Sequence, residues 1–101
     1  MLLKVLERVT LLGVLPESGD FLTLKIVRQL RENLSFNEDE IKALSIKTAD
    51  GRITWNAEVD EGKDVEIGEK ATDVVVDCLK KLDKEKKLTQ QHYSLYEKFC
   101  A

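Results

Sequence analysis

His92 is the first residue whose type suits chemistry, because an imidazole can act as a general base or as a pH-sensitive group. It is the only histidine in the chain. Leu95, Tyr96 and Phe99 follow it at helical spacing, which places His92 on the apolar side of a helix. No Ser, Cys or Asp accompanies it at a spacing typical of a catalytic motif. We therefore predict that His92 packs at the core with one hydrogen bond, and that the protein has no enzymatic activity.

Carboxylates are dense between residues 58 and 66, where oxygen ligands for a cation could gather. A calcium loop needs a glycine at its sixth position. Counted from Glu58 or from Asp60, Gly62 falls at the fifth or the third position instead. We therefore expect a solvated acidic loop and no metal site.

The segment from Gly68 to Thr72 is superficially similar to a phosphate-binding loop, but it lacks the required spacing of glycines and lysine. Glu66 and Glu69 would also repel a phosphate from the start of the helix that follows. Because neither a ligand cluster nor a phosphate loop is present, we predict no cofactor and no small-molecule substrate.

Lysines are concentrated toward the end of a predicted helix, between residues 80 and 87. Such a cluster could contact nucleic-acid phosphates, although lysines at a helix end also suit the helix dipole. Asp83 and Glu85 interrupt the cluster, and the formal net charge of −3 argues against nucleic acid. Nucleic-acid binding is therefore the alternative function, and its expected contact residues are Lys80, Lys81, Lys84 and Lys87. A second and weaker basic edge consists of Lys25, Arg28 and Arg31, and Glu32 offsets it.

Length and composition predict one domain over residues 1–101, because 43% of the residues are hydrophobic. The two cysteines, Cys78 and Cys100, are too few for a disulfide framework, and we expect both to behave as small buried hydrophobes. The first twelve residues lack the apolar run of a signal peptide, and no apolar run approaches the roughly 20 residues that span a bilayer. We therefore expect a cytoplasmic protein that does not contact membranes.

Helical periodicity predicts three helices in the first half of the chain, at about residues 2–12, 21–34 and 38–44. The apolar positions of the second helix cover an arc of roughly 200°, which is typical of a central helix with neighbours on two sides. Asn37 and Glu40 have the spacing of a capping box at the start of the third helix.

A β-hairpin is expected next, because Asp50-Gly51 is a strong two-residue turn signal between alternating segments. Residues 64–67 are expected to add a third strand, with Val65 and Ile67 pointing inward. The register predicted from the turn pairs Thr48 with Ile53 and Ile46 with Trp55.

Two helices complete the chain, one at about residues 69–86 and one that Thr89 caps. The predicted fold class is therefore α+β, in which helices precede a small antiparallel sheet and two C-terminal helices follow it.

Four segments of the chain resemble small uncharacterised proteins encoded by bacteriophages and prophages. They are ERVTLLGVLP at residues 7–16, FLTLKIVR at 21–28, GEKATD at 68–73 and YEKF at 96–99. The resemblance implies a short accessory protein in the cytoplasm of a host cell. It contains no catalytic motif and carries over no functional residue.

Binding to another protein is the favoured function, either to an unknown partner or to a second copy in a homodimer. Hydrophobic positions outside the helical stripes, or left over once the core is filled, are the candidate contacts. These are Leu11, Val14, Leu15 and Val76. The charge is also uneven, since six acids and two lysines lie at residues 57–70, whereas five lysines and two acids lie at 79–88. Such asymmetry could orient a partner.

Overall fold

The computed structural model describes residues 1–100. The elements in chain order are β1 (Leu2–Leu3), α1 (Val5–Val14), α2 (Phe21–Leu34), α3 (Glu38–Leu44), β2 (Lys47–Ala49), β3 (Arg52–Thr54), the 3₁₀ turn η1 (Ala57–Val59), β4 (Lys63–Asp64), α4 (Glu69–Lys84), the 3₁₀ turn η2 (Gln90–His92) and α5 (Tyr93–Cys100). The predicted α+β class is confirmed. Within this range, no helix is long and apolar enough to cross a membrane.

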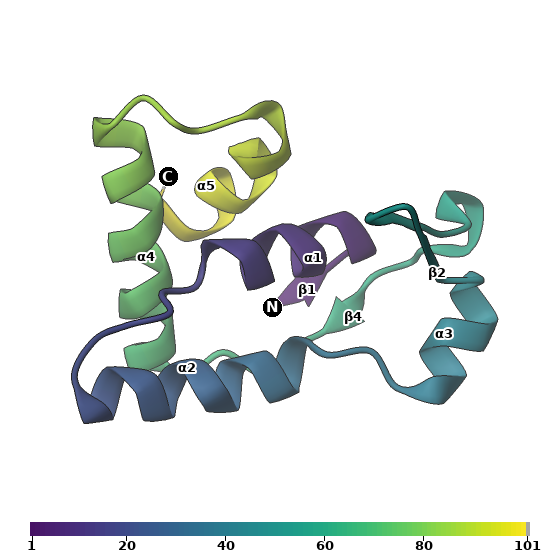
Figure 1. Cartoon of the computed structure of the whole chain (residues 1–101), viewed down its shortest axis with the longest axis horizontal. Coiled ribbons are helices and arrows are strands. Elements are labelled where there is room, and N and C mark those ends of the chain that lie inside the picture. Colours follow the sequence, from purple (N-terminus) through teal and green to yellow (C-terminus); the bar gives the residue numbers. More distant parts are fainter. Residues whose placement is uncertain (101) are drawn as a thin grey trace.

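Helix α1 lies in the middle of the helical part of the molecule (Figure 1). Helix α2 runs beneath it, α5 lies above it and α4 crosses one end, while α3 and the β2–β3 hairpin lie at the other end. One cluster of buried side chains joins α1, α2, α4 and α5 with β1 and the segment after β4. It comprises Leu3, Leu11, Leu15, Val27, Leu30, Leu34, Val65, Val75, Leu79 and Leu95.

Helix α4 has the amphipathic pattern that its sequence predicts. Its buried residues are Val75 and Leu79, and Ala71 and Val74 also pack against the core. The helix ends at Lys84, two residues before the predicted end. Lys86 then adopts a left-handed backbone with a φ of 58°, which ends the helical path.

The N-terminal segment differs from the prediction of a helix beginning at Leu2. Leu2–Leu3 pairs instead as β1 with Lys63–Asp64 of β4 in an antiparallel ladder. The ammonium of Met1 donates to Asp64 Oδ1 at 2.8 Å, and the first helical amide, that of Val5, donates to Asp60 Oδ2 at 3.0 Å. These partners are about sixty residues away in sequence, so helical periodicity alone could not reveal them.

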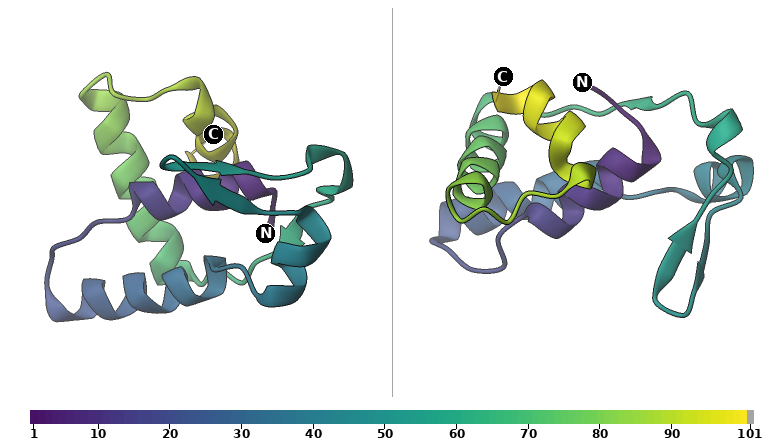
Figure 2. Two further views of the ribbon diagram at one scale, coloured as in Figure 1. Left: turned by 45° about the vertical axis from the view of Figure 1, so that its right-hand side comes forward. Right: turned by 90° about the horizontal axis from the view of Figure 1, so that it is seen from above.

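The hairpin forms where it is predicted. Asp50 and Gly51 have φ angles of 52° and 73°, as a tight two-residue turn requires, and Thr48 lies opposite Ile53. The predicted third strand is wrong, because β4 pairs with β1 and leaves the hairpin as a separate two-stranded sheet. Seen from above in Figure 2, the hairpin projects away from the helices.

Helix α2 has the predicted bounds but not the predicted surroundings. Val27, Leu30 and Leu34 are its only buried residues. Leu22 and Leu24 of its apolar arc are exposed and Ile26 is half-buried, so α2, whose neighbours are α1 and α4, lies at the edge of the core instead of in the predicted central position.

Gly13 offers a test of backbone stabilisation in α1. A Cβ at this position would meet no atom within 4 Å. We expect Gly13→Ala to raise the free energy of unfolding by about 0.5–1 kcal/mol, because alanine restricts the unfolded chain and favours helix. Thermal unfolding followed by circular dichroism should show a melting temperature higher by a few degrees.

Gly62 provides the opposite case for the same measurement. Its φ is +84°, and an added Cβ would lie 3.1 Å from the Leu2 side chain. Gly62→Ala should therefore lower the melting temperature. If Gly13→Ala and Gly62→Ala shifted the melting temperature in the same direction, this interpretation of the backbone conformation at the two glycines would be wrong.

Candidate functional site

The N-terminal half of α2 exposes three large apolar side chains. Phe21 is 84% accessible, Leu22 54% and Leu24 39%. Scattered exposed hydrophobes are ordinary, but a contiguous group of them tends to mark an interface. The exposed Lys25 and Arg28 share this side of the helix, and the half-buried Arg31 lies at its edge. Together the six residues form the α2 face, which consists of Phe21, Leu22, Leu24, Lys25, Arg28 and Arg31.

Helical geometry explains why these side chains point outward. Val27, Leu30 and Leu34 occupy the inner side of α2, and they are buried. At 100° per residue, Phe21 lies on the opposite side of the helix from Leu30. Figure 1 shows α1 and α4 on one side of α2 only, with no element beyond its lower edge. The outer side of α2 is therefore free to contact another molecule.

Asp20 fixes the start of α2 and hence the position of Phe21. Its carboxylate accepts a hydrogen bond of 2.7 Å from the N–H of Thr23, and this is the bond of a helix N-cap. Hydrogen bonds from Thr23 lower the pKa of Asp20. The turn that carries Phe21, Leu22 and Leu24 is thus the first turn of a capped helix.

The cations of the α2 face have no acidic partner within the described chain. The ion pairs found among residues 1–100 involve none of Lys25, Arg28 and Arg31. Arg28 and Arg31 also line a shallow hollow of about 310 Å³ beside Leu24 and Val27. Glu17 also lines this hollow, and the exposed Glu32 lies four residues after Arg28 on the same side of α2, so the α2 face combines apolar surface with a net excess of positive charge.

The residues predicted to contact a partner are not on this surface. Leu11 is completely buried and Leu15 is 4% accessible, so the prediction for these two is wrong. Helix α1 packs against α2, α4 and α5, and its leucines fill the core between them. Val14 and Val76 are half-buried. The signal that could have identified the α2 face was the wide apolar arc of α2, interpreted above as a sign of burial.

The lysines of the alternative function lie at and just beyond the end of α4. Lys80, Lys81, Lys84 and Lys87 are all exposed. Lys87 forms a loose ion pair with Glu85, with 3.9 Å between Nζ and Oε2. The cluster is accessible, and its acidic neighbours partly neutralise it.

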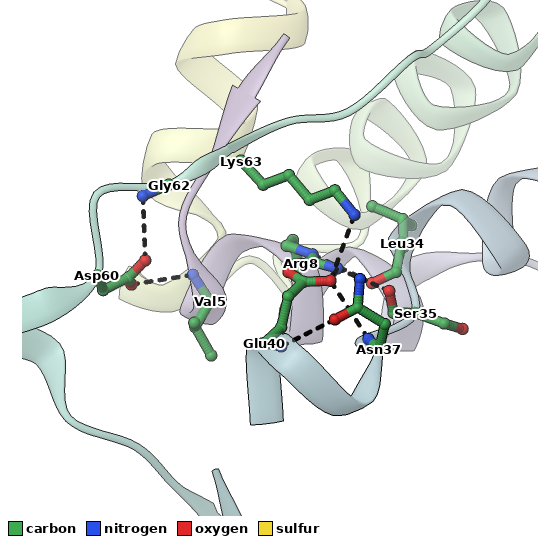
Figure 3. Close-up of polar contacts among 9 residues, drawn as sticks. All are labelled: Val5, Arg8, Leu34, Ser35, Asn37, Glu40, Asp60, Gly62 and Lys63. Carbon is green, nitrogen blue, oxygen red and sulfur yellow. Dashed lines mark hydrogen bonds and ion pairs between the residues drawn. The ribbon is translucent and has the colours of Figure 1, made fainter. Parts of the chain in front are cut away.

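A buried arginine that the sequence did not reveal connects α1, α2 and α3 (Figure 3). Arg8 Nε donates to the carbonyl of Leu34 at 3.1 Å, and Nη2 donates to the carbonyl of Ser35 at 2.7 Å. The guanidinium also pairs with both carboxylate oxygens of Glu40 and stacks 4.0 Å from the centre of the Phe36 ring. The sequence does contain a signal for this buried position, because Arg8 lies three positions after Val5 and therefore falls on the apolar side of α1.

Glu40 is the acidic centre of this network. It completes the predicted capping box with Asn37, and Lys63 Nζ lies 3.3 Å from its Oε1. Burial by itself would raise the pKa of Glu40, but hydrogen bonds from Arg8, the Asn37 N–H and Lys63 outweigh it and lower the pKa from 4.5 to about 2. All of these hydrogen-bond partners belong to the same chain, so the Glu40 carboxylate has a structural role.

A second buried carboxylate, Glu7, ties α5 to the opposite side of α1. Lys98 Nζ lies 2.9 Å from Glu7 Oε1 and 2.8 Å from Oε2, and it also donates to the carbonyl of Leu2 at 2.8 Å. Burial alone would raise the pKa of Glu7, but the N–H of Lys4 and the ammonium of Lys98 outweigh it, so the pKa is lowered.

His92 lies in η2 and not within α5. Its Nδ1 accepts a hydrogen bond of 2.9 Å from the N–H of Thr89, so the ring closes the turn before α5 and is only half-buried. The expectation that it belongs to the apolar stripe of the last helix is therefore corrected.

The other reactive side chains form no cluster. Cys78 and Cys100 are half-buried, and burial raises the pKa of both thiols, which opposes formation of a reactive thiolate. Over residues 1–100, no group of three His, Cys, Asp or Glu residues is placed to hold a metal ion.

Comparison with protein-family models, curated proteins and solved structures finds no match to this chain. The resemblance to phage-encoded proteins therefore stays a prediction from the four segments quoted above.

The lowered pKa of Glu40 predicts a pH-dependent contribution to stability. Because the folded carboxyl has a pKa of about 2 against an ordinary 4.5, its contribution is complete above the ordinary value and is lost as the pH falls toward 2. We expect Glu40→Gln to lower the free energy of unfolding at neutral pH by on the order of 3 kcal/mol, and by much less near pH 2. Urea unfolding at several pH values measures this difference.

Asp39→Asn is the matched control for this measurement. Asp39 is exposed on the same turn of α3, and no ion pair found among residues 1–100 involves it. Its substitution should change stability little at any pH. Parallel pH profiles for the wild type and Glu40→Gln would contradict the role assigned to Glu40.

Proposed function

We propose that the protein acts by binding another protein through the α2 face, without catalysing a reaction. The observation that carries the proposal is the exposure of Phe21, Leu22 and Leu24 together on a capped helix. Full burial of a large apolar side chain stabilises a complex by roughly 1.5–3 kcal/mol. An exposed aromatic residue held on a helix is also typical of the few anchors that dominate interfaces.

The charge of the α2 face favours an acidic partner over a second copy of this chain. In a symmetric pairing of two α2 faces, the three cations of each copy would face one another with only Glu32 of each copy on the same side of the helix to offset them. Like charges brought together in this way oppose association. An amphipathic segment with apolar anchors flanked by carboxylates would complement both properties of the α2 face. We therefore propose an acidic, partly apolar segment as the occupant.

Nucleic-acid binding is the second candidate, and the exposure of Lys80, Lys81, Lys84 and Lys87 supports it. Its driving force would be the release of counterions from phosphates. The net charge of −3 and the interleaved acids weaken that force. Nucleic-acid binding through these lysines would also assign no function to the exposed apolar residues in the first turn of α2.

Selection of peptides on the immobilised protein tests the first proposal. From a random peptide library, we expect enriched sequences that combine acidic residues with aromatic or branched apolar residues. Phe21→Ala should weaken their binding at least about tenfold, because it removes the proposed anchor. Because Phe21 is 84% accessible, stability should stay nearly unchanged. Isothermal titration calorimetry measures the affinity, and chemical shifts of labelled protein locate the peptide.

Tyr93→Ala is the matched control, because Tyr93 is another exposed aromatic residue, 62% accessible at the start of α5. Its substitution should leave peptide binding unchanged. Equal losses for Phe21→Ala and Tyr93→Ala would overturn the proposal. So would a wild-type dimer that sedimentation velocity shows to dissociate in Phe21→Ala, because the occupant would then be a second copy.

Charge reversal separates the two candidate functions. Arg28→Glu should slow association with an acidic peptide and reduce its dependence on salt, whereas Lys84→Glu, with the same change of net charge, should not. Stopped-flow fluorescence with a labelled peptide at low and high salt measures both rates. In parallel, a labelled DNA duplex at low salt tests the alternative. Retention of the duplex by the wild type and its loss in Lys84→Glu would favour nucleic-acid binding.

A further inference from the structure

A hollow of about 580 Å³ lies between α1, the end of the hairpin and η2. Figure 2 shows the hairpin crossing in front of α1 in the left-hand view and projecting away from the helices in the other, and residues of both line the hollow. The volume is in the range of sites that bind small molecules. The hollow is separate from the α2 face, since the two share no lining residue.

Two sides of the hollow are apolar. Leu6 and Val9 contribute from α1, and Ile53 and Trp55 contribute from β3 and the residues after it. Trp55 is half-buried, so part of its ring is accessible. Gly13 adds no side chain to the floor, and a Cβ there would meet no atom within 4 Å. A flat apolar group would find contact surface on the Trp55 ring without displacing protein atoms.

The polar residues that line the hollow favour a negatively charged ligand. No carboxylate lines it, whereas Arg52 does, and the ion pairs found among residues 1–100 do not involve Arg52. His92 also lines it. Because Nδ1 of this ring accepts the N–H of Thr89, its ring proton resides on Nε2, which remains a hydrogen-bond donor. The hollow thus offers cationic and donor groups beside apolar walls.

We infer that this hollow binds a small aromatic carboxylate, with its ring against Trp55 and its carboxylate paired with Arg52. No sequence motif predicts this ligand, because the walls come from segments near residues 6–13, 52–55 and 91–92. The inference is independent of protein binding through α2.

The single tryptophan of the chain makes the inference directly testable. The probes are 3-phenylpropionate and its neutral amide, which have nearly the same shape. In two-dimensional ¹H–¹⁵N spectra, 3-phenylpropionate should shift the one indole N–H signal saturably. The amide should bind about tenfold more weakly, because it lacks the charge that pairs with a guanidinium.

Two variants separate loss of binding from loss of fold. Arg52→Gln should weaken binding of 3-phenylpropionate about tenfold, whereas Lys47→Gln, at an exposed cation of the same hairpin that neither lines the hollow nor forms an ion pair among residues 1–100, should not. Gly13→Leu should place a side chain at the wall of the hollow and weaken binding, and its melting temperature reports whether the fold is retained.

Three results would overturn the inference. They are an indole signal that does not move up to the solubility limit of 3-phenylpropionate, equal affinities for the acid and the amide, and undiminished binding by Arg52→Gln. Each can be obtained while the α2 face still binds its peptide, so failure here is distinguishable from failure of the proposed function.

Discussion

The buried guanidinium of Arg8 is the interaction on which the arrangement of the first three helices depends. It takes up the carbonyls of Leu34 and Ser35, which the end of α2 would otherwise leave without partners, and it pairs with Glu40 in the first turn of α3. Substitution of one residue of a buried ion pair lowers the free energy of unfolding strongly, because the other residue is left as a buried charge without a partner. This loss is far larger than the net contribution of the intact pair to stability. The network therefore fixes where α2 stops and α3 begins relative to α1.

This anchoring explains why α2 can expose apolar residues at its other end. Its C-terminal half is held by the Arg8 contacts and by burial of Leu30 and Leu34, whereas its first turn is held by the Asp20 cap. Helices α2, α4 and α5 already pack against α1, and the outer residues of α2 are not part of the core that they form. Phe21 and its neighbours are thus available for a contact outside the chain, while the helix that carries them remains ordered.

Local signals in the sequence predicted the elements that local interactions determine. The Asn37–Glu40 capping box, the Asp50-Gly51 turn and the periodicity of α4 all act within a few residues, and all three appear in the structure. Pairings between distant segments were not predictable in this way. The β1–β4 ladder joins residues about sixty positions apart, and neither strand is longer than two residues. A strand this short has no period-two pattern to detect.

The same distinction explains the misplaced contact residues. Periodicity tells which residues share one side of a helix, but it does not tell how many neighbours the helix has. The wide apolar arc of α2 suggested a central helix, and Leu11 was expected to be exposed because it falls outside the apolar stripe of α1. In the structure α1 is the enclosed helix, because its leucines pack against α2, α4 and α5, and the neighbouring Glu7 and Arg8 link it to Lys98 of α5 and Glu40 of α3. Helix α2 lies at the edge of this core, and its exposed apolar residues are therefore available for binding.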